Sequence, residues 1–119
     1  MFHVRADLSK EPMASLCLLS EDGATTQRWE LGDRPLAVGR DNTSDIIVED
    51  QTLSRRHFVI IRKAGEYLLN DLESQNGTFV DGHRVSAEPA KLRHDVCIAA
   101  GRTLFVFSQK NAAASAVAL

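Results

Sequence analysis

Short apolar runs separated by polar turn residues recur along this 119-residue chain. Alternating or continuous apolar positions over about four to eight residues are typical of β-strands. The pattern predicts strands over residues 14–20, 27–31, 35–39, 46–48, 56–62, 67–72, 78–80, 95–99 and 103–107. It predicts no amphipathic helix of about ten or more residues between positions 13 and 108.

Turn signals separate these runs at intervals of about eight to twelve residues, which is the spacing of an all-β sandwich. Asp22-Gly23 and Asp81-Gly82 predict tight hairpin turns, the second of the type I′ class. We therefore expect one domain over residues 13–108, a tail or loosely attached strand over 1–12, and an Ala-rich tail over 109–119. This last segment could also form a short helix.

Composition narrows the class of function. The hydrophobic share of 44% and charged share of 25% are ordinary for a globular domain. A net charge of −2 and a pI near 6.0 argue against a general nucleic-acid or membrane-surface binder, since these usually carry a basic excess. No signal-peptide or membrane-span pattern occurs, so we expect a cytoplasmic protein.

The two cysteines, Cys17 and Cys97, lie in apolar runs and are expected to be buried, reduced thiols. No cluster of cysteines or histidines has the spacing of metal ligands. We expect neither a metal nor a cofactor.

Three polar clusters interrupt the predicted strands: Gly39-Arg40, Ser54-Arg55-Arg56-His57 and the segment from Ser74 to Thr78. Turns at one end of a sheet stack can face a common point. The clusters would bring arginine guanidinium groups, a serine hydroxyl and an asparagine amide together there. Guanidinium forks and hydroxyl donors suit a phosphate, because they supply charge-assisted hydrogen bonds in bidentate geometry.

The order and spacing of these clusters resemble the forkhead-associated (FHA) domain, a phosphothreonine-peptide reader. The likeness extends from about Leu36 to Phe107 and rests on Gly-Arg, Ser-Arg-x-His and Asp-Leu-x-Ser-x-Asn-Gly-Thr in combination. It implies a two-sheet β-sandwich of short, mostly antiparallel strands with binding loops at one end. It also implies a non-catalytic module of Ser/Thr kinase signalling. Its partner would be a phosphothreonine-containing protein or peptide, from a kinase or a kinase substrate.

The resemblance assigns four phosphopeptide-binding residues. Arg40 would form the main salt bridge to the phosphate, and the Ser54 hydroxyl would donate to a phosphate oxygen. Arg55 would add a second phosphate contact. The Asn76 amide would hold peptide backbone groups on either side of the phosphorylated residue.

Four further residues are expected to support the binding loops. Gly39 would let the backbone approach its neighbour closely, and Gly77 would supply the turn conformation. His57 would hold the serine segment in place, and Ser74 would tie its own loop together. At position 75 many relatives carry Ser, Thr or Arg, so no contact is carried over to Gln75.

Two other hypotheses remain. Strand 56–62 has apolar residues on both faces, with Phe58 and Ile60 on one and Val59 and Ile61 on the other. This pattern fits either a strand covered on both sides or a scaffold that dimerises or binds a partner without phosphate. The second is a hydrolase that uses Ser54 and His57. The sequence contains no Gly-x-Ser-x-Gly nucleophile elbow, which argues against it.

Overall fold

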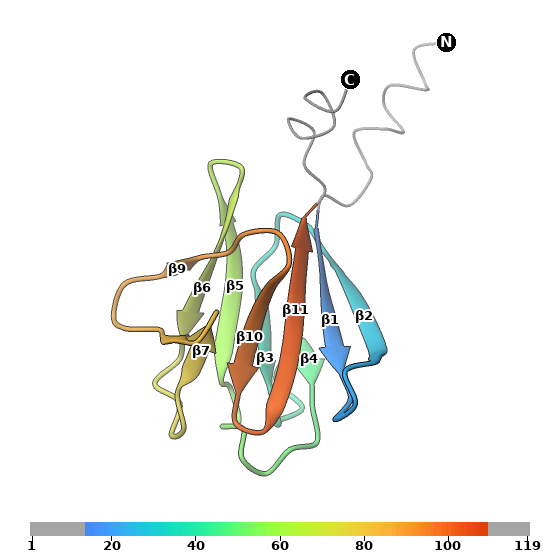
Figure 1. The fold of residues 1–119 in the computed structure, drawn as a ribbon. Coiled ribbons are helices and arrows are strands. Elements are labelled where there is room, and N and C mark those ends of the chain that lie inside the picture. The colour runs from blue at the N-terminus through green and yellow to red at the C-terminus, as the bar shows by residue number, and fades with distance from the viewer. Residues whose placement is uncertain (1–13, 110–119) are drawn as a thin grey trace.

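Two β-sheets packed face to face make up residues 14–109, the part of the chain that this computed structural model describes (Figure 1). Sheet A has the order β2-β1-β11-β10-β7-β8. Its strands are β1 (Ala14–Leu19), β2 (Thr25–Leu31), β7 (Thr78–Val80), β8 (His83–Arg84), β10 (Val96–Ala100) and β11 (Thr103–Gln109). Sheet B has the order β4-β3-β5-β6-β9. Its strands are β3 (Leu36–Gly39), β4 (Ile46–Ile47), β5 (Phe58–Lys63), β6 (Glu66–Asp71) and β9 (Ala90–Lys91).

The arrangement confirms the predicted two-sheet sandwich. All strand pairs are antiparallel except β3 with β4, where Val38 lies opposite Ile46 in parallel register. The predicted tail over 1–12 lies outside the described residues, as does the C-terminal tail except for Gln109, which ends β11. Residues 14–109 contain no helix, and hence none long and apolar enough to cross a membrane.

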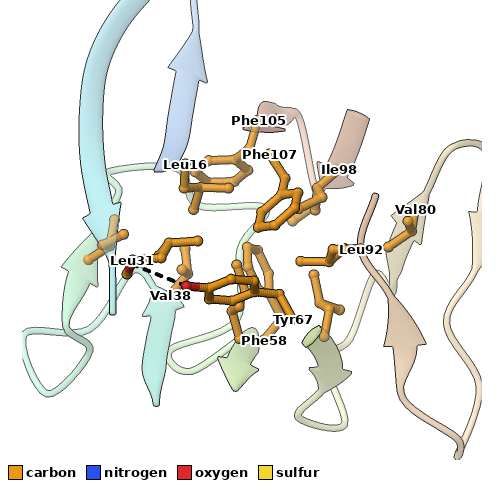
Figure 2. Close-up of a cluster of buried hydrophobic side chains, with 14 of the residues drawn as sticks. Leu16, Leu31, Val38, Phe58, Tyr67, Val80, Leu92, Ile98, Phe105 and Phe107 are labelled. Atoms are coloured by element: carbon orange, nitrogen blue, oxygen red, sulfur yellow. Dashed lines mark hydrogen bonds between the residues drawn. The ribbon is translucent and has the colours of Figure 1, made fainter. Parts of the chain in front are cut away.

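Alternate residues of the two sheets fill the core between them (Figure 2). Its largest side chains come from both layers: Leu16, Ile98, Phe105 and Phe107 from sheet A, and Val38, Phe58 and Tyr67 from sheet B. The buried Tyr67 hydroxyl donates to the Leu31 carbonyl at 3.4 Å, so its one polar group is paired. Burial of each such side chain contributes about 1.5–3 kcal/mol, which makes this layer the main source of stability.

Strand β5 has one buried face and one partly exposed face. Phe58 and Ile60 are buried in the core, whereas Val59 and Ile61 are half-buried on the outer face of sheet B. Apolar residues therefore lie on both faces of β5, as predicted. Within the described residues no further layer of the fold covers the outer face.

The cysteine prediction is wrong in part. Cys17 and Cys97 are both free but only half-buried. Each lies opposite Val106 in the register of sheet A, so all three residues share the outer face of that sheet. Successive residues of a strand point to opposite faces, and the core face at these positions belongs to Leu16 and Ile98.

Local boundaries differ modestly from the prediction. Strand β9 pairs with β6 in a segment for which the sequence predicts no strand, and β2 begins two residues before its predicted start. The predicted type I′ turn is present, since Asp81 and Gly82 have φ of 52° and 83°.

Hydrogen bonds join four connections at one end of the sandwich, the lower end in Figure 1: β3–β4, β4–β5, β6–β7 and β10–β11.

Candidate functional site

The site begins at the end of β3, where two backbone segments come unusually close. A Cβ atom on Gly39 would lie 2.1 Å from the Arg55 carbonyl oxygen and 2.8 Å from the Ser44 Oγ. No side chain fits there, so glycine is required by the close approach and not by its φ angle. The approach lets the Arg40 amide donate to the Ser54 carbonyl at 3.2 Å. The end of β3 is thereby fastened to the loop that carries Ser54 and Arg55.

Arg40 is exposed, but one end of its guanidinium is fixed. Its Nε donates to the Leu53 carbonyl at 2.9 Å. The two terminal nitrogens make no hydrogen bond to the described residues and can donate to an outside acceptor.

Ser54 is half-buried beside Arg40, and its hydroxyl oxygen accepts a hydrogen bond from the Gln75 amide at 3.0 Å. Because the oxygen is used as an acceptor, the hydroxyl hydrogen remains available to donate. The Gln75 backbone thus orients the Ser54 hydroxyl.

These residues line a hollow of about 230 Å³ together with Gln51, Thr52, Leu53, Arg55 and Gln75. The lining contains two arginines and no carboxylate. Larger hollows exist, including one of about 450 Å³ beside β8, but we place the site in the smaller one because it joins two guanidinium groups to an oriented hydroxyl. Its chemistry suits a small anion with several acceptor oxygens.

His57 is fully buried and joins two of the loops. Its Nδ1 accepts from the Ser54 amide at 3.0 Å, so Nε2 carries the proton and donates to the Gly77 carbonyl at 2.8 Å. Both ring nitrogens are therefore occupied by backbone groups. Neither is bonded to the Ser54 hydroxyl, which argues against the Ser54–His57 hydrolase hypothesis.

Asp71, to which sequence reasoning gave no role, organises the β6–β7 loop. Its carboxylate accepts from the Ser74 amide at 3.0 Å, the Ser74 hydroxyl at 2.5 Å and the Thr78 hydroxyl at 2.6 Å. Burial raises the pKa of this carboxyl, but these hydrogen bonds outweigh it, and the pKa lies below its ordinary value. An Asp three residues before a Ser was the available signal, since such pairs often form local side-chain to backbone turns.

Asn76 is exposed at the rim and does not line the hollow. Its Nδ2 donates to the Thr52 carbonyl at 2.7 Å, which leaves its carbonyl oxygen and one N–H for another partner. Gly77 follows with φ of 82°, a left-handed conformation that favours glycine. The structure thus brings Arg40, Ser54 and Arg55 around one hollow and sets Asn76 beside it.

A second carboxylate that the sequence did not single out, Asp50, holds Thr52 in place. Asp50 accepts from the Thr52 amide at 2.8 Å and from the hydroxyls of Thr52 and Thr103 at 2.6 and 2.7 Å. The Arg102 amide donates to the Thr52 hydroxyl oxygen at 2.8 Å. Sheet A therefore supports the same residue that positions Asn76, through contacts fifty residues apart in sequence.

Comparisons with known proteins agree on one family. The FHA domain model matches residues 36–101. The FHA domain-containing protein FhaB of Mycobacterium tuberculosis is 30% identical over 73 residues, covering 61% of this chain and 47% of that protein, so the chain spans about half of that relative's length.

Solved structures give the same result. The FHA domain of the CT664 protein from Chlamydia trachomatis has a TM-score of 0.76 and 27% identity, over 83% of this chain and 99% of that one. A structure from a structural and functional analysis of phosphothreonine-dependent FHA domain interactions has a TM-score of 0.72 and 26% identity, over 83% and 98% of the two chains.

Proposed function

The chain belongs to the FHA domain family, and on that premise we propose that it is a non-catalytic module that binds phosphothreonine peptides in Ser/Thr kinase signalling. The observation that carries the proposal is the hollow where Arg40, Ser54 and Arg55 meet without a carboxylate. FHA domains are interaction modules, and one solved relative comes from work on phosphothreonine-dependent interactions. The partner would be a phosphorylated kinase or kinase substrate in the cytoplasm.

In this proposal the phosphate occupies the hollow. It carries about −1.5 to −2 charges and three strong acceptor oxygens at neutral pH. The terminal nitrogens of Arg40, the Ser54 hydroxyl and the Arg55 guanidinium supply donors for those oxygens. Because Arg40 is already fixed through Nε, less side-chain freedom is lost when the phosphate binds.

Asn76 would then hold the peptide backbone. Its free carbonyl oxygen accepts from a peptide N–H, and its second amide hydrogen donates to a peptide carbonyl. The bond from Nδ2 to the Thr52 carbonyl keeps the side chain at the rim before the peptide arrives. Preference for phosphothreonine over phosphoserine would come from burying one methyl group, worth up to about 1 kcal/mol.

The alternative function is a scaffold that binds a partner without phosphate. Half-buried Val59 and Ile61 on the outer face of sheet B favour it. The arrangement of Arg40, Ser54 and Asn76 favours the phosphopeptide module, because a scaffold has no need of converging anion donors.

Isothermal titration calorimetry separates the two functions. An oriented phosphothreonine-peptide library first identifies a ligand, and the selected peptide is then titrated in phosphorylated and unphosphorylated form. We expect binding of the phosphorylated form only, and weak binding when Asp or Glu replaces the phosphothreonine, since a carboxylate has fewer acceptors and less charge. Equal affinity for the phosphorylated and unphosphorylated peptides would support the scaffold.

A further inference from the structure

Arg84 on β8 lies close to the rim of the site, because β8 pairs with β7 directly after the third polar cluster and places Arg84 opposite Phe79. Its guanidinium carbon sits 5.9 Å from the centre of the Phe79 ring. The same group lies against Gly77, where an added Cβ atom would be 3.0 Å from both Cζ and Nε of Arg84. Gly77 directly follows Asn76, so the guanidinium lies against the residue next to the one proposed to hold the peptide.

Among residues 14–109 no carboxylate lies within ion-pair distance of the Arg84 guanidinium, although Asp81 and Glu88 line the same hollow beside β8. The ion pairs of that region use Arg62, Lys91 and His94, and no hydrogen bond there involves the Arg84 guanidinium. The Phe79 ring and Gly77 restrain the guanidinium from two sides, while Arg84 as a whole remains exposed to solvent. A restrained and unpaired guanidinium at a binding rim is suited to an anion from outside the chain.

The separation from the phosphate hollow fits a short peptide. The Ser54 hydroxyl contacts the Gln75 amide at 3.0 Å. From Gln75 to Gly77 the backbone extends this distance by at most about 7 Å, and from the Gly77 backbone to the Arg84 guanidinium by roughly another 5 Å. Arg84 therefore lies within about 15 Å of the Ser54 hydroxyl, a distance that about four residues of an extended peptide span at roughly 3.3 Å each.

We propose that Arg84 recognises a second anionic side chain on the same ligand, within about four residues of the phosphothreonine. The second group is a carboxylate or a second phosphate, since both offer the paired oxygens that a guanidinium fork binds. This inference rests on the proposed function. It adds a selection rule, namely that the preferred ligand carries two anions at fixed spacing.

The test uses peptides with one fixed phosphothreonine in an otherwise alanine and glycine background. Glutamate is placed singly at each of the four positions on either side, and a second series carries phosphoserine at the same positions. Each peptide is titrated into wild type, Arg84→Gln, Arg84→Lys and Arg28→Gln. Arg28 is a matched control, because it is an exposed arginine of the same sheet on β2, at the opposite edge from β8.

We expect one or two adjacent positions at which glutamate strengthens wild-type binding roughly three- to tenfold, as for a charged hydrogen bond at an exposed rim. Arg84→Gln should abolish that gain and leave binding of the parent peptide unchanged, whereas Arg28→Gln should keep the gain. Arg84→Lys should retain only part of it, because an ammonium lacks the fork. The phosphoserine series shows whether the second anion is preferably a phosphate.

If Arg84→Gln and wild type gain equally from every added anion, the inference about Arg84 is wrong while the proposed function stands. If wild type binds none of the phosphothreonine peptides, including the ligand selected from the library, both fail together. A gain lost equally in Arg84→Gln and Arg28→Gln would mean that net charge alone is responsible, which also contradicts a specific Arg84 contact.

Discussion

Replacing His57 with alanine is expected to destabilise the fold before it affects phosphate recognition. The imidazole pairs two backbone groups, the Ser54 amide at 3.0 Å and the Gly77 carbonyl at 2.8 Å. Alanine leaves both without a partner. A buried polar group that loses its partner costs about 1–3 kcal/mol, and the fully buried ring also leaves a cavity.

These terms suggest a loss of about 3 kcal/mol of unfolding free energy in His57→Ala. For a domain of this size, that loss corresponds to a fall in melting temperature of roughly 12–24 °C. Phosphopeptide affinity at low temperature should fall less, and only because the loop that holds Ser54 is looser. Circular dichroism during thermal unfolding measures the melting temperature, and calorimetric titration of the same protein measures the phosphopeptide affinity.

Two variants make the comparison decisive. Arg40→Ala should show the opposite behaviour, with affinity reduced at least about tenfold and stability changed by about 1 kcal/mol, because only its bond to the Leu53 carbonyl is lost from the fold. His83→Ala removes an exposed histidine from β8 and should change neither quantity. If His57→Ala melts like wild type yet binds no phosphopeptide, His57 is a direct ligand and the division of roles is incorrect.

Two further predictions concern the close approach at Gly39 and the half-buried carboxylate of Asp71. Gly39→Ala should be strongly destabilised and lose phosphopeptide binding, because its Cβ would lie 2.1 Å from the Arg55 carbonyl oxygen. The control Gly32→Ala has open space around the new Cβ and should melt and bind like wild type. Equal melting temperatures for the two variants would contradict the close approach at Gly39. The folded-state pKa of Asp71 lies below its ordinary value of 3.8, so the stability that its carboxylate supplies is complete above that pH and is lost as the pH falls through the folded-state pKa. Urea unfolding at pH 6 and pH 3 should therefore show a smaller pH dependence in Asp71→Asn than in wild type, and an unchanged dependence would show that Asp71 does not contribute.

The candidate site could be predicted only in part. Its polar clusters were visible because Gly39-Arg40, Ser54-Arg55 and Asn76-Gly77 are turn sequences between strands, and turns at one end of a sandwich come together. Asp71 left a local signal in Ser74, three residues later, whereas the role of Asp50 in joining the two sheets left none. Asp50 acts through Thr103, in the other sheet, and no local pattern reports such a pairing.

The sequence by itself determined most of the strands, the turns and the sandwich, because side-chain alternation and left-handed turn positions such as Asp81-Gly82 depend only on neighbouring residues. Only the tertiary structure decided which strands pair, which face of each strand is covered, and that Cys17 and Cys97 lie on the outer face of sheet A. The physical reason is that burial and pairing depend on surfaces brought together from distant parts of the chain, whereas periodicity specifies only that a strand has two faces.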